Sequence, residues 1–232
     1  MKQSRIILIL FIIISFFSIN ITAKAEGFDP DNYAVFFPTE TQTYAPRPVI
    51  IGFSPSGNGK DVINIWKEAA EENNCAIIAS NKVRNGKDIQ AELLVIKKDL
   101  NEYFSKEYPI DMKKVIAVGS SGGGMASHLF SFLHPDTVSA VISNVGYIHE
   151  GTLSQSKIYP QNKICAFLAG TTDYNYKLMK EDLKFLQNHG WACKWIEFVG
   201  GHVMAPQEQR KEALKFVLDE LEKREQASNQ DN

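Results

Sequence analysis

Short runs of apolar residues recur along most of the chain, and stretches of mixed polarity separate them. The runs are four to eight residues long and rich in Val, Ile and Phe, which is typical of strands that are buried on both faces of a sheet. They predict strands at Ala34–Phe37, Val49–Phe53, Ala76–Ala79, Val115–Val118, Val138–Val145, Ile164–Ala169 and Lys194–Val199.

Between these runs, apolar residues recur every three or four positions, which indicates amphipathic helices. Val62, Trp66 and Ala69, for example, would share one face of a helix. Pro206 suits the first turn of the last helix, and Gly190 follows the end of the one before it. The pattern predicts helices over Asp61–Asn73, Asp88–Lys106, Met125–Leu133, Tyr176–Asn188 and Pro206–Arg224.

Strands that alternate with helices predict an α/β fold, with a mainly parallel central sheet and helices on both of its faces. We find no internal repeat and no linker rich in Pro, Gly or Ser, so residues 26–232 are expected to form one domain. The segment between Val145 and Ile164 is too short for a cap domain, so a site at the sheet edge should be open to solvent.

The first 25 residues have the form of a secretory signal peptide. Lys2 and Arg5 give a positive start, Ile6–Phe17 is almost wholly apolar, and Ala23-Lys24-Ala25 is a small-x-small cleavage site. The apolar core is shorter than the roughly 20 residues of a spanning helix. We therefore expect an exported protein, periplasmic or extracellular, without a stable membrane anchor after cleavage. An uncleaved anchor is the alternative.

Charge and cysteine content narrow the possible partners. The 232 residues include 25 basic and 27 acidic ones, a net charge of −2, which gives no electrostatic footprint for nucleic acid. Cys75, Cys165 and Cys193 lie in or beside apolar runs, which favours buried free thiols over a disulfide. Their spacing to histidines is not that of a metal site, so no metal ligand is predicted.

The strongest chemical signal is the segment Gly119-Ser120-Ser121-Gly122-Gly123, which reads G-x-S-x-G around Ser121. A predicted strand enters it and a predicted helix leaves it. Such a turn needs small neighbours, because the serine backbone is strained and the helix packs close to the strand. The turn lifts the hydroxyl to the carboxyl edge of the sheet, where open α/β folds bind ligands. Ser121 is therefore a predicted nucleophile, with a simple packing turn as the alternative.

A serine hydroxyl needs a base, and the base needs an orienting acid. His202 follows the last predicted strand on a Gly200-Gly201 loop and is the predicted base. Asp173 follows the strand Ile164–Ala169 and is the predicted acid, although a helix N-cap is a common role for such an aspartate. Parallel strands bring their carboxyl ends to the same edge, so the two side chains should converge on Ser121.

Ser121, Asp173 and His202, in this order and each after a strand, resemble the catalytic set of the α/β-hydrolase fold. The resemblance spans about residues 33–225. The runs Ser121-Gly122-Gly123-Gly124-Met125-Ala126, Gly170-Thr171-Thr172-Asp173 and Gly200-Gly201-His202 are similar to those of small secreted serine esterases such as polyhydroxybutyrate depolymerases and feruloyl esterases. The resemblance implies hydrolysis of a small-molecule or polymer-borne carboxylic ester through a Ser121 acyl-enzyme, without a cofactor or metal.

One loop departs from that family. After the strand Val49–Phe53 such enzymes usually carry a His-Gly pair, whereas this chain has Ser54-Pro55-Ser56. Pro55 has no N–H to donate. The expected oxyanion donors are therefore the backbone N–H groups of Gly122 and Ser56. The altered loop keeps two alternatives open: an acyltransferase or amidase of the same fold, and a ligand-binding member without catalysis.

Overall fold

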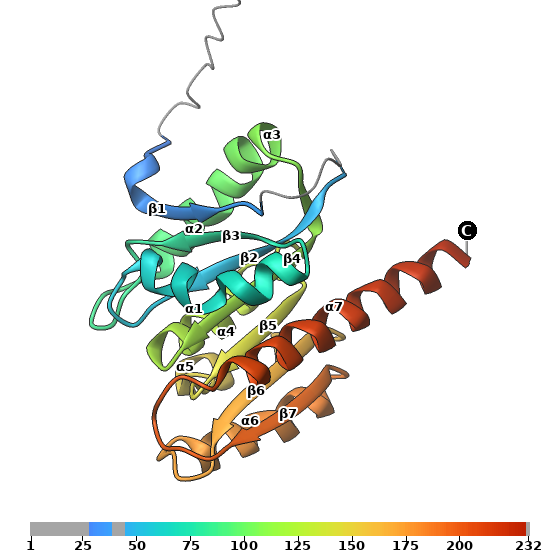
Figure 1. Ribbon diagram of the computed structural model, residues 1–232. Coiled ribbons are helices and arrows are strands. Elements are labelled where there is room, and N and C mark those ends of the chain that lie inside the picture. Colours follow the sequence, from blue (N-terminus) through green and yellow to red (C-terminus); the bar gives the residue numbers. More distant parts are fainter. Residues whose placement is uncertain (1–27, 39–44, 231–232) are drawn as a thin grey trace, which may run out of the picture.

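The computed structural model describes residues 28–38 and 45–230, so the predicted signal peptide lies outside the described residues. Figure 1 shows a central sheet flanked by helices. The strands are β1 (Tyr33–Phe36), β2 (Arg47–Phe53), β3 (Ala76–Ser80), β4 (Ile110–Ser120), β5 (Ala140–Asn144), β6 (Ile164–Gly170) and β7 (Ala192–Phe198). The α-helices are α1 (Gly59–Glu72), α2 (Gln90–Asp99), α3 (Ser105–Glu107), α4 (Gly122–Leu133), α5 (Glu150–Leu153), α6 (Tyr176–Asn188) and α7 (Gln207–Gln230).

The strands form one seven-stranded sheet in the order β1-β3-β2-β4-β5-β6-β7. Every neighbouring pair is parallel except β1 and β3, where Tyr33 lies opposite Ser80 in an antiparallel pair. The predicted α/β class with a mainly parallel sheet is thus confirmed. The carboxyl ends of β4, β6 and β7 meet at one edge, and these strands precede the three predicted site residues.

Helices cover both faces of the sheet and enclose two apolar cores. On one face, α1 and α7 bury side chains such as Trp66 and Leu214 against the strands. On the other face, α2, α4 and α6 bury side chains such as Leu93, Phe130 and Leu186. In Figure 1, α7 crosses in front of β5 and β6. The helix that follows Ser121 packs against β4, β5 and β2 on the second face.

The predicted helix over Asp88–Lys106 is interrupted in the structure. A π-helical turn, Leu100–Phe104, separates α2 from α3. An α-helical turn contains 3.6 residues, so residues that are four apart are separated by slightly more than one turn. Apolar residues at this spacing therefore rotate gradually around an α-helix and leave its buried face. The wider π turn corrects this drift and keeps both Leu100 and Phe104 buried.

Most other elements differ from the predicted boundaries by one to three residues, and the larger differences are at β4, α7 and α5. Strand β4 begins five residues before the predicted Val115, and α7 continues past Arg224 to Gln230. The short helix α5 lies in the segment after β5, where no helix was predicted. Within residues 28–38 and 45–230, no helix is long and apolar enough to cross a membrane.

Candidate active site

Ser121 occupies the sharp turn between β4 and α4. Its φ of 53° and ψ of −121° lie in a region that non-glycine residues rarely adopt. The Ser121 N–H donates to the carbonyl of Asn144 on the neighbouring strand, with an N···O distance of 2.9 Å. Because this bond holds the backbone in its strained form, the hydroxyl stands above the sheet edge.

The glycines around Ser121 are required by close backbone packing. A Cβ on Gly119 would overlap the carbonyl of Gly123, and a Cβ on Gly123 would overlap the carbonyl of Phe53. A Cβ on Gly146, in the loop after β5, would lie 2.7 Å from the Ser121 carbonyl oxygen. These close approaches explain why the G-x-S-x-G pattern is visible in the sequence.

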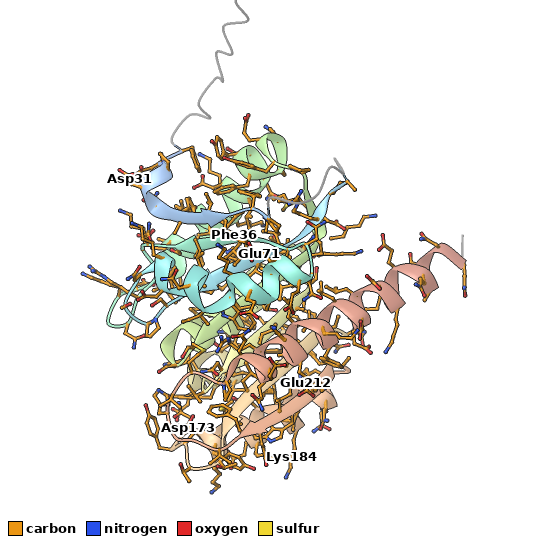
Figure 2. The ribbon with its side chains drawn as sticks, in the orientation of Figure 1. Asp31, Phe36, Glu71, Asp173, Lys184 and Glu212 are labelled. Carbon is orange, nitrogen blue, oxygen red and sulfur yellow. The ribbon has the colours of Figure 1, made fainter. Side chains whose placement is uncertain are left out.

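The structure brings the three predicted site residues into one hydrogen-bonded chain. Ser121 Oγ lies 2.7 Å from His202 Nε2, and His202 Nδ1 lies 3.0 Å from Asp173 Oδ1. The imidazole is partly accessible, with 23% of the side chain exposed, whereas the Asp173 side chain is fully buried. The histidine can therefore reach a substrate while its partner carboxylate is shielded from water. Figure 2 labels Asp173 at the edge where the loop from β7 to α7 begins.

Backbone contacts between two loops position Asp173 and His202. Thr172 N–H donates to the carbonyl of Gly200 over 2.9 Å, and a Cβ on Gly170 would overlap the carbonyl of Gly201. Asp173 Oδ1 also accepts the N–H of Asn175 over 3.0 Å. The aspartate therefore forms a local turn just before α6 as well as contacting His202. It is not the N-cap of α6, because that position is Asn175, which makes no side-chain capping hydrogen bond.

Tyr174 covers the face of the His202 ring. The two rings stack with centroids 4.3 Å apart and planes 23° apart, yet Tyr174 is 72% exposed. Val203, beside the histidine, is 55% exposed. The base thus lies under an exposed apolar rim.

Asn144 is a residue that the sequence analysis missed. It is fully buried at the carboxyl end of β5, and its Nδ2 donates to Ser120 Oγ over 3.3 Å and to the Val203 carbonyl over 3.2 Å. Its Oδ1 accepts the Ala205 N–H over 2.8 Å. One side chain therefore connects the serine turn to the histidine loop. An amide inside the apolar run Val138–Val145 was the signal that could have revealed it.

The loop predicted to complete an oxyanion hole is a tight turn. Gly57 N–H donates to the Ser54 carbonyl over 3.1 Å, and the N–H of Ser56 donates to Ser54 Oγ over a longer 3.3 Å. The first N–H groups of α4, beginning with Gly122, receive no side-chain cap from Ser121. The helix terminus therefore presents backbone donors that Ser121 does not cap, whereas the N–H of Ser56 already has a weak partner.

A cavity of about 670 Å³ opens next to this loop. Ser54 and Gly122 are among its lining residues, and Met125, Leu129 and Phe132 of α4 form an apolar part of its wall. Residues of the β3–α2 loop and of the α5 region close the other sides. A substrate held there would lie beside the predicted nucleophile.

Two buried titratable groups lie behind the site. Burial lowers the pKa of His128 to about 3, so this α4 histidine is neutral near neutral pH. Burial raises the pKa of Asp182 to about 7, and this α6 carboxylate accepts the Ile148 N–H over 2.7 Å.

Among residues 28–38 and 45–230, no three His, Cys, Asp or Glu side chains are grouped as metal ligands. The three cysteines are free, and only Cys193 is partly exposed.

Comparison with solved structures agrees with this architecture. The chain is similar to esterase PE8, with a TM-score of 0.61 and 17% identity over 81% of this chain and 98% of that one. It is similar to Thermogutta terrifontis esterase 2 phosphonylated by cyclosarin, with a TM-score of 0.62 and 13% identity over 81% and 88%. It is also similar to a ferulic acid esterase, with a TM-score of 0.55 and 19% identity over 82% and 91%.

The fold of this protein is thus the α/β-hydrolase fold that these esterases share, as the resemblance implied. No family model and no curated protein sequence matches the chain.

Proposed function

We propose that this protein is a serine hydrolase that cleaves a carboxylic ester, with Ser121 as nucleophile, His202 as base and Asp173 as orienting acid. The observation that carries the proposal is the continuous chain of hydrogen bonds from Ser121 Oγ through the imidazole to Asp173 Oδ1. Each member of a Ser–His–Asp set needs its neighbour at this distance to act. Structural similarity to several esterases supports the reaction class.

In the first half of the reaction, neutral His202 accepts the Ser121 proton at Nε2 while Oγ attacks the carbonyl carbon of the ester. The imidazolium that forms is stabilised by Asp173 through Nδ1–H. Negative charge develops on the former carbonyl oxygen, where the N–H groups of Gly122 and Ser56 are the proposed donors. The carbon–oxygen bond to the alcohol then breaks, and Nε2–H protonates the leaving oxygen.

In the second half, water attacks the Ser121 acyl-enzyme and gives its proton to His202 Nε2. The tetrahedral intermediate collapses, the carboxylic acid leaves, and Ser121 recovers the proton. Each step moves a proton only between Oγ, water, the alcohol and one ring nitrogen. The 23% exposure of the His202 side chain is compatible with entry of this water.

We also propose that the protein acts outside the cytoplasm, after removal of residues 1–25. The support is the charged start, the short apolar core and the Ala23-Lys24-Ala25 site in the sequence. Amino-terminal sequencing of protein recovered from the exported fraction should begin at or near Glu26. A mature chain that begins at Met1 and remains with the membrane would contradict this proposal.

The activity is tested with a fluorophosphonate probe and p-nitrophenyl esters on the mature protein. We expect wild type to be labelled and to release p-nitrophenol, and Ser121→Ala to lose both. Ser120→Ala is the matched control, because the same hydroxyl is removed one position away and both activities should largely remain.

Labelling that survives Ser121→Ala would show that the nucleophile lies elsewhere. A folded wild type that takes no probe and cleaves no ester would favour the ligand-binding alternative. Parallel assays with p-nitroanilides and with acceptor alcohols separate ester hydrolysis from amide cleavage and acyl transfer.

A further inference from the structure

We propose that the cavity beside Gly122 is the binding site for the acyl part of the ester, and that it selects extended apolar acyl groups over acetyl. This inference rests on the proposed function. His202 Nε2 must protonate the leaving oxygen, so the alcohol lies on the His202 side of the site.

The cavity lies on the opposite side. All of its lining residues fall between Ser54 and Gln155, so the loops that carry Asp173 and His202 contribute none of them. Gly122, whose N–H is a proposed oxyanion donor, lines the cavity. With the carbonyl oxygen directed to Gly122 and the alcohol to His202, the remaining substituent of the carbonyl carbon is the acyl chain.

The wall of the cavity is an apolar stripe along α4. Met125, Leu129 and Phe132 recur at helical spacing after Gly122, and Leu133 ends the row. These side chains are only partly buried, so they present apolar surface to the cavity instead of filling the core. At 1.5 Å per residue the stripe from Gly122 to Leu133 is about 16 Å long, which suits an extended chain.

The opposite wall combines apolar and polar side chains, and the Asn85 amide lies beside Gly122, where a Gly122 Cβ would be 1.8 Å from Asn85 Oδ1. Val83 is 2% exposed and Ile89 is partly buried, whereas Arg84 and Lys87 are exposed. The whole cavity is comparable in size to pockets that enclose drug-sized ligands. A two-carbon acetyl group would leave most of this apolar surface in contact with water, so a longer acyl group should bind better.

The test is a series of p-nitrophenyl esters from acetate through hexanoate and octanoate to dodecanoate, which share one leaving group. Each methylene that enters an apolar site should raise kcat/KM about fourfold. We therefore expect octanoate to exceed acetate by about 10²-fold or more in wild type. Leu129→Trp should fill the middle of the cavity and lower the octanoate-to-acetate ratio about 10–100-fold.

Leu133→Trp blocks the far end and should lower the ratio of dodecanoate to hexanoate more than the ratio of hexanoate to acetate. This second variant keeps the test valid if Leu129→Trp does not fold. The matched control is Leu94→Trp, because Leu94 is 57% exposed on α2 and does not line the cavity. It should leave every ratio unchanged.

The acyl assignment would be overturned if acetate cleavage depends on Ser121 while kcat/KM is flat along the wild-type series. It would also be overturned if Leu129→Trp changes the ratio of octyl acetate to ethyl acetate and not the acyl ratio, because the cavity would then hold the alcohol. In both cases the proposed function stands. Absence of any Ser121-dependent cleavage would overturn the proposed function and this inference with it.

Discussion

On the Ser121 side of the site, backbone lies against backbone: a Cβ on Gly119 or Gly123 would overlap a neighbouring carbonyl. On the His202 side, a loop with an exposed Tyr174 and Val203 is held by hydrogen bonds and one ring stack. Ser121 is thus positioned by glycines that let neighbouring backbone segments pack closely. His202 is positioned by the hydrogen bonds and the ring stack of its loop.

This contrast predicts which substitutions the Ser121 side and the His202 side of the site should tolerate. Close packing of the neighbouring backbone supports the strained conformation of Ser121. The histidine loop has exposed side chains that can vary, provided that the hydrogen bonds to Asp173 and Asn144 remain. Substitutions should therefore act through folding on the first side and through geometry on the second.

The largest effect is expected from Asp173→Asn. An amide can donate to His202 Nδ1, which leaves the proton on Nε2 and prevents it from accepting the Ser121 proton. We expect kcat to fall by about 10⁴-fold with little loss of stability. Steady-state kinetics with p-nitrophenyl butyrate measure this, and the exposed Asp136→Asn is the control. A fall below tenfold would remove Asp173 from its proposed role.

A smaller effect is expected at the altered loop. Ser56→Pro removes the proposed backbone donor and should lower kcat by about 10²–10³-fold, the usual cost of one oxyanion donor. Ser56→Ala keeps the N–H and should retain most activity, which makes it the matched control. Equal rates for wild type and a folded Ser56→Pro would assign the second donor to another group.

The pH dependence of stability tests the contact that Asp182 makes with the loop beside Ser121. Its carboxylate on α6 accepts the N–H of Ile148, in the loop that packs on Ser121 through Gly146. Burial raises its pKa from 3.8 to about 7, so the folded state holds the proton more tightly than the unfolded chain. Its favourable contribution is present at low pH and is lost as the pH rises through about 7.

Asp182→Asn cannot ionise and should not show this loss. Between pH 5 and pH 8, we expect the free energy of unfolding of wild type to fall by about 3 kcal/mol relative to the variant. Urea unfolding of both proteins across this range measures the difference, in which the titration of His128 cancels. A constant difference would show that Asp182 ionises as easily in the folded state as in the unfolded one.

The smallest effect is expected from Asn144→Ala, which removes the bridge between the two sides of the site. The histidine loop loses its bonds at Val203 and Ala205, while the Ser121 N–H keeps its bond to the backbone carbonyl of residue 144. We expect kcat to fall about 10–100-fold with little change in KM, because a small displacement of the base costs about this much.

Fluorophosphonate labelling of Asn144→Ala should slow in proportion to kcat. Equal losses in kcat and thermal stability, with fast labelling of the folded fraction, would indicate a purely structural role for Asn144. Asn81→Ala, which removes another amide with contacts to backbone, is the matched control for stability.

The alternation of strands and helices, the mainly parallel sheet and the glycine-rich turn could be read from the sequence alone. Each depends on residues close together in the chain: Val115–Val118 is a continuous apolar run, and Gly119 and Gly123 flank Ser121 directly. The selection of Asp173 and His202 followed from strand order, and their catalytic roles stay predictions. Local periodicity contains this information because secondary structure repeats over a few residues.

Only the tertiary structure revealed the bridge made by Asn144, the cavity along α4 and the π turn at Leu100–Phe104. The bridge joins residues 59 and 61 positions apart, and the residues that line the cavity come from four separate stretches of the chain. A partly buried Leu129 has the same helical spacing as a core residue, so periodicity alone could not show that it faces a cavity. Such features depend on which distant segments pack together, and the local sequence pattern does not show which segments these are.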